Sequence, residues 1–197
     1  MIPLPAQNPD GSYSFTAGMQ IDGDGANGQS SAPVYAPHGY TPEPLDFLAN
    51  AGGPGNWYGV VTLHGQPLIQ TADDPAPGAY IAATSYMTPG ANSTDPRAYI
   101  DANAVPFIVI PSHWRAEAEG VVLGCKATVL DTHTGKLLDN AIVGDFGPNS
   151  KTGEASIAVA RFFDVPCSPK NGGTDTPRFL YTFFPGVKAD GFELIPA

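Results

Sequence analysis

The chain has 197 residues, of which 42% are hydrophobic, enough to enclose one core but short for two. Its 19 acidic and 9 basic residues give a formal net charge of −10, and the basic residues form no cluster that would neutralise nucleic-acid phosphates. No stretch approaches the roughly 20 apolar residues of a membrane span. We therefore expect a single domain over residues 1–197, with no nucleic-acid or membrane partner.

Glycine and proline are unusually frequent, with 23 and 21 residues. An interior glycine costs a helix about 1 kcal/mol and an interior proline about 3 kcal/mol, so long helices are disfavoured. The composition therefore predicts a β-rich fold, mainly β with one principal helix.

In chain order, residues 1–12 predict an N-terminal arm, and residues 13–21 alternate as a first strand. The strand ends at the acidic turn 22–25, Asp-Gly-Asp-Gly. Residues 26–56 carry a glycine or proline every few positions, which predicts a long irregular loop. Loops of this length in a compact domain are usually functional.

Further strands are expected downstream. Residues 104–111 form a short, β-branched apolar run bounded by prolines, which predicts a buried strand. Residues 121–130 and 138–143 flank a turn signal at 131–136 and predict an antiparallel ribbon. Shorter apolar segments predict strands at 57–63, 78–86 and 179–184.

One segment, residues 154–163, predicts the principal helix. Its apolar residues recur at helical spacing, and Asp164-Val165-Pro166 ends it. This places Glu154 at the helix N-terminus, where unsatisfied N–H groups favour a carboxylate.

The sequence gives no metal pattern. Cys125 and Cys167 allow one disulfide, which their spacing leaves open, and the four histidines are isolated. The turn at Asp22 begins like a calcium loop, but Asn27 and Pro33 stand where a glycine and a glutamate are needed. We expect neither metal nor cofactor.

Carboxylates gather at predicted turns: Asp22 and Asp24 after the first strand, Asp145 after a later strand, and Glu154 at the helix start. Glycoside hydrolysis needs one protonated and one ionised carboxyl group. The apolar neighbours of Asp145 favour its neutral form, which would make it the acid and Glu154 the base. Ordinary helix capping and turn chemistry explain the same residues, so this assignment stays open.

A family resemblance favours the catalytic interpretation. The segment Ala141-Ile142-Val143-Gly144-Asp145, followed by Gly153-Glu154-Ala155-Ser156-Ile157, resembles the signature of glycoside hydrolase family 75, the endo-chitosanases known mainly from fungi. The resemblance runs in order over roughly residues 15–186. Its other matching segments are 19–25, 84–86, 104–111, 123–124 and 180–186.

The resemblance implies that Asp145 and Glu154 are the catalytic pair, on a compact β-barrel of the double-psi type. It implies endo-cleavage of β-1,4 linkages in chitosan with inversion, for which the two carboxyl groups lie about 6.5–9.5 Å apart. We accordingly expect a secreted, extracellular monomer.

Chitosan carries protonated amines, which acidic side chains and a negative field attract. Aromatic side chains are the usual platforms for sugar rings, and Trp57 is one further candidate. The expected substrate contacts are Asp22, Asp24, Thr84, Tyr86 and Trp114. Three alternatives remain: a hydrolase of a peptidoglycan-type amino-sugar polymer, a non-catalytic carbohydrate-binding barrel, and a purely structural or scaffold protein.

Overall fold

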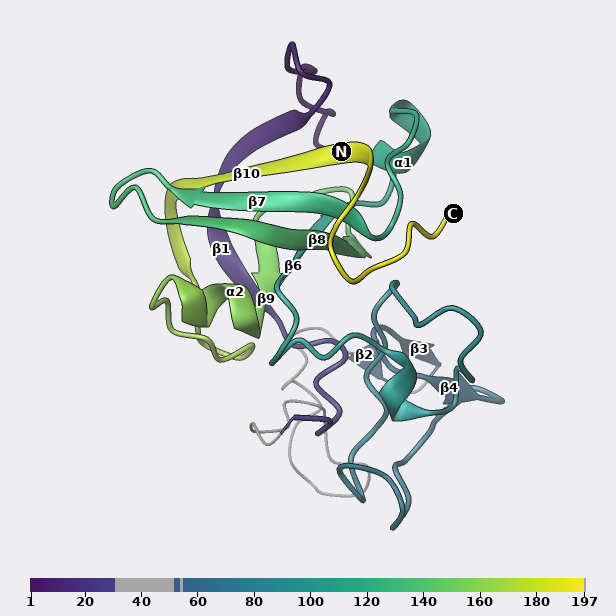
Figure 1. The fold of residues 1–197 in the computed structure, drawn as a ribbon. Helices are drawn as coiled ribbons and strands as arrows, with labels where there is room; N and C mark the ends of the chain where they lie inside the picture. The colour runs from purple at the N-terminus through teal and green to yellow at the C-terminus, as the bar shows by residue number, and fades with distance from the viewer. Residues whose placement is uncertain (31–51, 54, 197) are drawn as a thin grey trace.

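The computed structural model describes residues 1–30, 52–53 and 55–196, and its centre is a closed barrel of six β-strands (Figure 1). Around the barrel the strands follow the order β1, β10, β7, β8, β6, β9. The expected β-rich fold with a single compact barrel is thereby confirmed. The strands are β1 (Tyr13–Asp22), β6 (Phe107–Pro111), β7 (Cys125–Asp131), β8 (Leu137–Gly147), β9 (Glu154–Ser156) and β10 (Thr174–Lys188).

The strand pairing around the barrel is mixed, and the double-psi type that the resemblance implies stays a prediction. β7 pairs antiparallel with β8 and β10, whereas β1 runs parallel to β9 and β6 runs parallel to β8. In these registers Val109 of β6 lies opposite both Asp145 of β8 and Glu154 of β9. Asp22 ends β1 beside β9, opposite Ser156. The pairing therefore brings three carboxylates from distant parts of the sequence to one region of the barrel.

The barrel core forms because alternate residues of strands such as β7 point inward, while β6 is buried along its whole length. On β10 the inward side chains are Phe179, Tyr181 and Phe183. Trp114 stacks on Phe183, with ring centroids 5.9 Å apart. Burying such aromatic rings supplies a large share of the apolar area that stabilises the barrel.

The helices are shorter than expected: α1 (Trp114–Glu117), α2 (Ile157–Phe162) and a 3₁₀ turn, η1 (Pro96–Ala98). The prediction that Glu154 begins the helix is wrong, because residues 154–156 pair with β1 and β6 and close the barrel. Ser156 is the N-cap, and its hydroxyl accepts a hydrogen bond from the Val159 amide.

A second lobe, residues 55–100, lies against one end of the barrel (Figure 1). The long strands predicted at 57–63 and 78–86 are wrong, since the lobe has only short pairs and isolated bridges such as Val60 with Ala82. Frequent glycine and proline interrupt longer ladders. Its short strands are β3 (Asn56–Trp57), β4 (Thr62–Leu63) and β5 (Gln66–Pro67), and β3 pairs with β2 (Gly52–Gly53), which precedes the lobe.

The chain that leaves β1 is fastened to this lobe. The buried Asn27 side chain accepts a hydrogen bond from the Ala82 amide and donates to the Ala82 carbonyl, at 2.7 and 2.8 Å. Residues 26–30 form no helix or strand, as the loop prediction requires, whereas residues 31–51 and 54 lie outside the described residues. At its C-terminal end the prediction is wrong, because Gly52 and Gly53 pair with Asn56 and Trp57 as β2 and β3.

The N-terminal arm is held on the barrel. The Ile2 amide donates to the Asn149 carbonyl, and the indole of Trp114 donates to the Ile2 carbonyl. Cys125 and Cys167 are both free thiols, so the structure contains no disulfide between them. Within the described residues, no helix has the length and apolar character needed to cross a membrane.

Candidate active site

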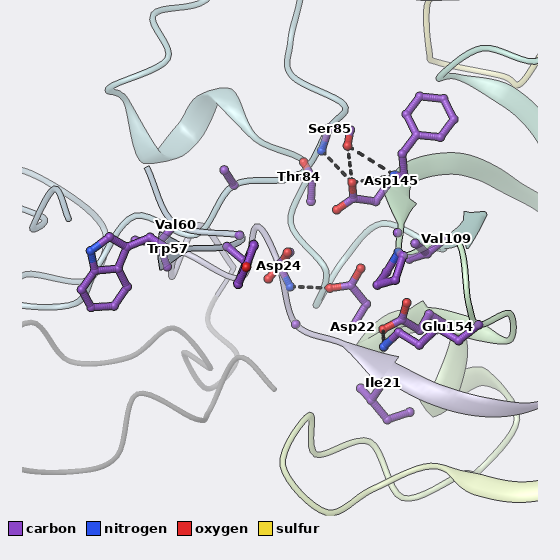
Figure 2. A pocket seen from close by; sticks show the side chains of 18 residues that line it. Ile21, Asp22, Asp24, Trp57, Val60, Thr84, Ser85, Val109, Asp145 and Glu154 are labelled. Atoms are coloured by element: carbon purple, nitrogen blue, oxygen red, sulfur yellow. Dashed lines mark hydrogen bonds and ion pairs between the residues drawn. The ribbon is translucent and has the colours of Figure 1, made fainter. Parts of the chain in front are cut away.

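A cleft of about 820 Å³ lies where the barrel meets the second lobe. From the barrel it is lined by Asp22, Asp145 and Glu154, and Asp24 joins them from the turn after β1. Residues 57–60 and 83–85 line it from the second lobe. Figure 2 shows the four carboxylates gathered around this space.

Asp145 is the most enclosed of the four, with 7% of its surface exposed. It lies near the end of β8, which runs four residues beyond the predicted 138–143 strand, rather than after the strand. Its Oδ1 accepts hydrogen bonds from the Ser85 amide at 3.0 Å, the Ser85 hydroxyl and the Phe146 amide at 2.7 Å. Burial raises the pKa of Asp145 to about 6, against the lowering effect of these donors.

Glu154 has a different environment. Its Oε1 forms an ion pair with the ammonium of Lys151, which also donates to Gln20 at 3.4 Å. A β-carbon added at Gly147 would lie 3.0 Å from Glu154 Oε2, so the absence of a side chain there leaves room for the carboxylate. The positive charge beside Glu154 comes from Lys151 and not from a helix N-terminus.

Asp22 and Asp24 are the other two carboxylates that line the cleft. The Asp24 amide donates to Asp22 Oδ1 at 2.8 Å. Burial, and next the charge of Asp145, raise the pKa of Asp22 well above its usual value, while burial and the charge of Asp22 do the same for Asp24. Gly59, at φ 60°, allows the close approach of Asp24, because a β-carbon there would lie 2.5 Å from Asp24 Oδ2.

One carboxylate oxygen each from Asp22, Asp24 and Asp145 lies within 4.8 Å of the others. Such a group suits a single positive charge, such as that of an ammonium group.

Of the three other predicted substrate contacts, one lines the cleft and two do not. Thr84 lines the cleft, although its hydroxyl donates to the Tyr86 carbonyl at 2.7 Å. Tyr86 is buried, its hydroxyl accepts from the Glu193 amide, and it does not line the cleft. Trp114 is fully buried in the barrel core. The structure therefore unites Thr84 with the four carboxylates and places Tyr86 and Trp114 elsewhere.

Several residues of the cleft were not singled out from the sequence as site residues. Ser85 and Lys151 contact the two candidate catalytic carboxylates, and Tyr58 lines the cleft with 56% of its surface exposed. Its neighbour Trp57, which the sequence did suggest as a platform, also lines the cleft. For Lys151 a sequence signal exists, since it stands three residues before Glu154. Ser85 lies 60 residues from Asp145, and only the fold reveals their contact.

No protein-family model matches the chain, and a search among curated proteins finds no match.

Proposed function

We propose that the protein is an endo-acting glycoside hydrolase that cleaves β-1,4 linkages in chitosan with inversion. The observation that carries the proposal is the contrast between two carboxylates on either side of Val109. Asp145 is buried, and its pKa is raised to about 6, whereas Glu154 is paired with an ammonium group. Glycoside hydrolysis requires two carboxyl groups in different environments, one that donates a proton and one that accepts it.

In the proposed reaction, protonated Asp145 is the general acid and Glu154 the general base. Asp145 transfers its proton to the glycosidic oxygen as the bond from that oxygen to the anomeric carbon breaks. Glu154 takes a proton from a water molecule, whose oxygen bonds to the anomeric carbon from the opposite face. The products are two shorter chains, one with a new reducing end of inverted configuration.

The charge of the cleft supports a cationic substrate. Among the described residues that line it are four carboxylates and one cationic side chain, that of Lys151. A sugar bearing a protonated amine would place that amine among Asp22, Asp24 and Asp145, where a positive charge compensates the crowded carboxylates. The family 75 resemblance supports the same substrate, and we extend it to the expectation of a secreted monomer.

The direct test is incubation with highly deacetylated chitosan, followed by measurement of reducing ends. Asp145→Asn and Glu154→Gln should each abolish nearly all activity, whereas the exposed controls Asp139→Asn, also on β8, and Glu119→Gln should retain it. An inert wild type, or a site variant that keeps most of its activity, contradicts the proposal.

Two alternatives are separated by the same assay. Release of reducing ends from bacterial cell walls but not from chitosan would indicate a peptidoglycan-type hydrolase. Binding to chitosan without a change in its chain length would indicate a carbohydrate-binding barrel.

A further inference from the structure

Ser85 is the residue of the second lobe that forms hydrogen bonds with the carboxylate of Asp145. Both its amide and its hydroxyl donate to Asp145 Oδ1. The hydroxyl also accepts from the Phe146 amide at 3.3 Å, so it bridges the carboxylate and the backbone that follows it.

The loop around Ser85 is fixed by its two neighbours. The Tyr86 amide donates to the Gly144 carbonyl of β8 at 3.0 Å, and the Thr84 hydroxyl donates to the Tyr86 carbonyl. The Tyr86 hydroxyl is in turn held by the Glu193 amide. Thr84 and Tyr86 therefore have a structural role on either side of Ser85: together they hold this loop against β8, the strand that carries Asp145.

The three donors on Oδ1 determine which oxygen of Asp145 carries its proton. An oxygen that accepts from the Ser85 amide, the Ser85 hydroxyl and the Phe146 amide has no free direction for a proton of its own. The proton of the neutral acid therefore resides on Oδ2. In Figure 2 this second oxygen points away from Ser85, towards the side of the cleft where Asp22 and Asp24 lie.

We propose that Ser85 is a positioning residue for Asp145, which holds Oδ1 as a hydrogen-bond acceptor and so presents the transferable proton on Oδ2 to the cleft. This inference rests on the proposed role of Asp145 as the general acid. It assigns to Ser85 a task in proton transfer without contact with the reacting atoms.

The same contact tunes the acid. Burial raises the pKa of Asp145, and the Ser85 hydroxyl and amide are the largest influences that lower it. A hydroxyl that donates to a carboxylate stabilises the ionised form, so its removal raises the pKa further. Ser85→Ala should therefore extend activity to higher pH, because the acid keeps its proton, while the maximal rate falls because the acid is weaker and less firmly held.

The test compares wild type, Ser85→Ala and Ser85→Thr by carboxyl carbon NMR of labelled aspartate and by the pH dependence of kcat on chitosan. In Ser85→Ala we expect the titration midpoint of Asp145 and the alkaline limb of the rate profile to rise together by about one pH unit. Ser85→Thr should restore both. Ser112→Ala, which removes a hydroxyl that bonds Asn149 and not Asp145, should leave the midpoint in place.

An unchanged or lowered midpoint in Ser85→Ala refutes the inference, even if the wild type is an active chitosanase. An inert wild type refutes the proposed function instead, and the NMR titration then shows separately whether Ser85 governs the protonation of Asp145. If Ser85→Ala does not fold, Ser85→Cys, with its weaker donor, should give a smaller upward shift, and no shift there would overturn the inference.

Discussion

Gly147 offers a sharp test of the position of Glu154. An added β-carbon would lie 2.9 Å from Val109 Cγ1 and 3.0 Å from Glu154 Oε2, whereas ordinary contact begins at 3.4 Å. Gly147 does not have a positive φ, so Gly147→Ala introduces the steric contacts without backbone strain. The Glu154 carboxylate must therefore move by the difference, 3.4 − 3.0 = 0.4 Å.

A misplacement of about 1 Å can reduce the rate about 100-fold, so a displacement of this size should lower kcat about sixfold. KM should change less, because Asp22 and Asp24 lie away from the added methyl group. Crowding against Val109 should also cost about 1–3 kcal/mol of stability, measured by thermal unfolding.

Steady-state kinetics on soluble chitosan provide the measurement, and Glu154→Asp provides the control background. Shortening the side chain withdraws the carboxylate from the added methyl group, so Gly147→Ala should lower kcat much less in that background. An equal loss in both backgrounds would refute the claim that the effect acts through Glu154.

Three further predictions concern charge. Asp145→Asn should stabilise the protein at pH 7, because the pKa of Asp145 is raised in the folded state. The contribution of Asp145 to stability is therefore complete below about pH 4 and is lost as the pH rises through about 6. Chemical denaturation should show this loss as about 3 kcal/mol in the wild type, whereas the amide of the variant does not titrate. Stability curves for the two proteins that run parallel from pH 4 to 7 would contradict this. Lys151→Met should reduce kcat at least tenfold and Lys151→Arg should restore much of it, since the cation holds Glu154 in place; equal kinetics for Lys151→Met and wild type would exclude that role. Gly59→Ala should raise KM for chitosan more than it lowers kcat, because it displaces Asp24, and an unchanged KM would show that Asp24 does not bind the substrate.

The barrel strands were predictable because their patterns are local. Alternation marks residues 13–21 and 121–130, and the continuous apolar run at 104–111 marks β6, which is buried on both faces. The second lobe was not predictable in the same way. Its apolar residues pack in small clusters under loops, so the run at 78–86 reads as a strand although it forms only isolated bridges.

Glu154 shows where local reasoning failed. The helical spacing of apolar residues is real from residue 157 onward, but residues 154–156 take their hydrogen bonds from β1 and β6, which lie far away in the sequence. This tertiary pairing overrides the helical pattern and removes helix capping as the explanation of Glu154. The two candidate catalytic residues could be named from the motif, whereas their meeting across Val109 follows only from the barrel register.

The central claim is that Asp145 and Glu154 together hydrolyse a β-1,4 linkage of chitosan. The most direct measurement is a proton NMR time course of wild-type protein acting on highly deacetylated chitosan. Inversion at the anomeric carbon of a β-1,4 linkage predicts that the first new reducing ends have the α configuration and convert to the β form only by later mutarotation. New ends that appear first as the β anomer, or no new reducing ends, would contradict it.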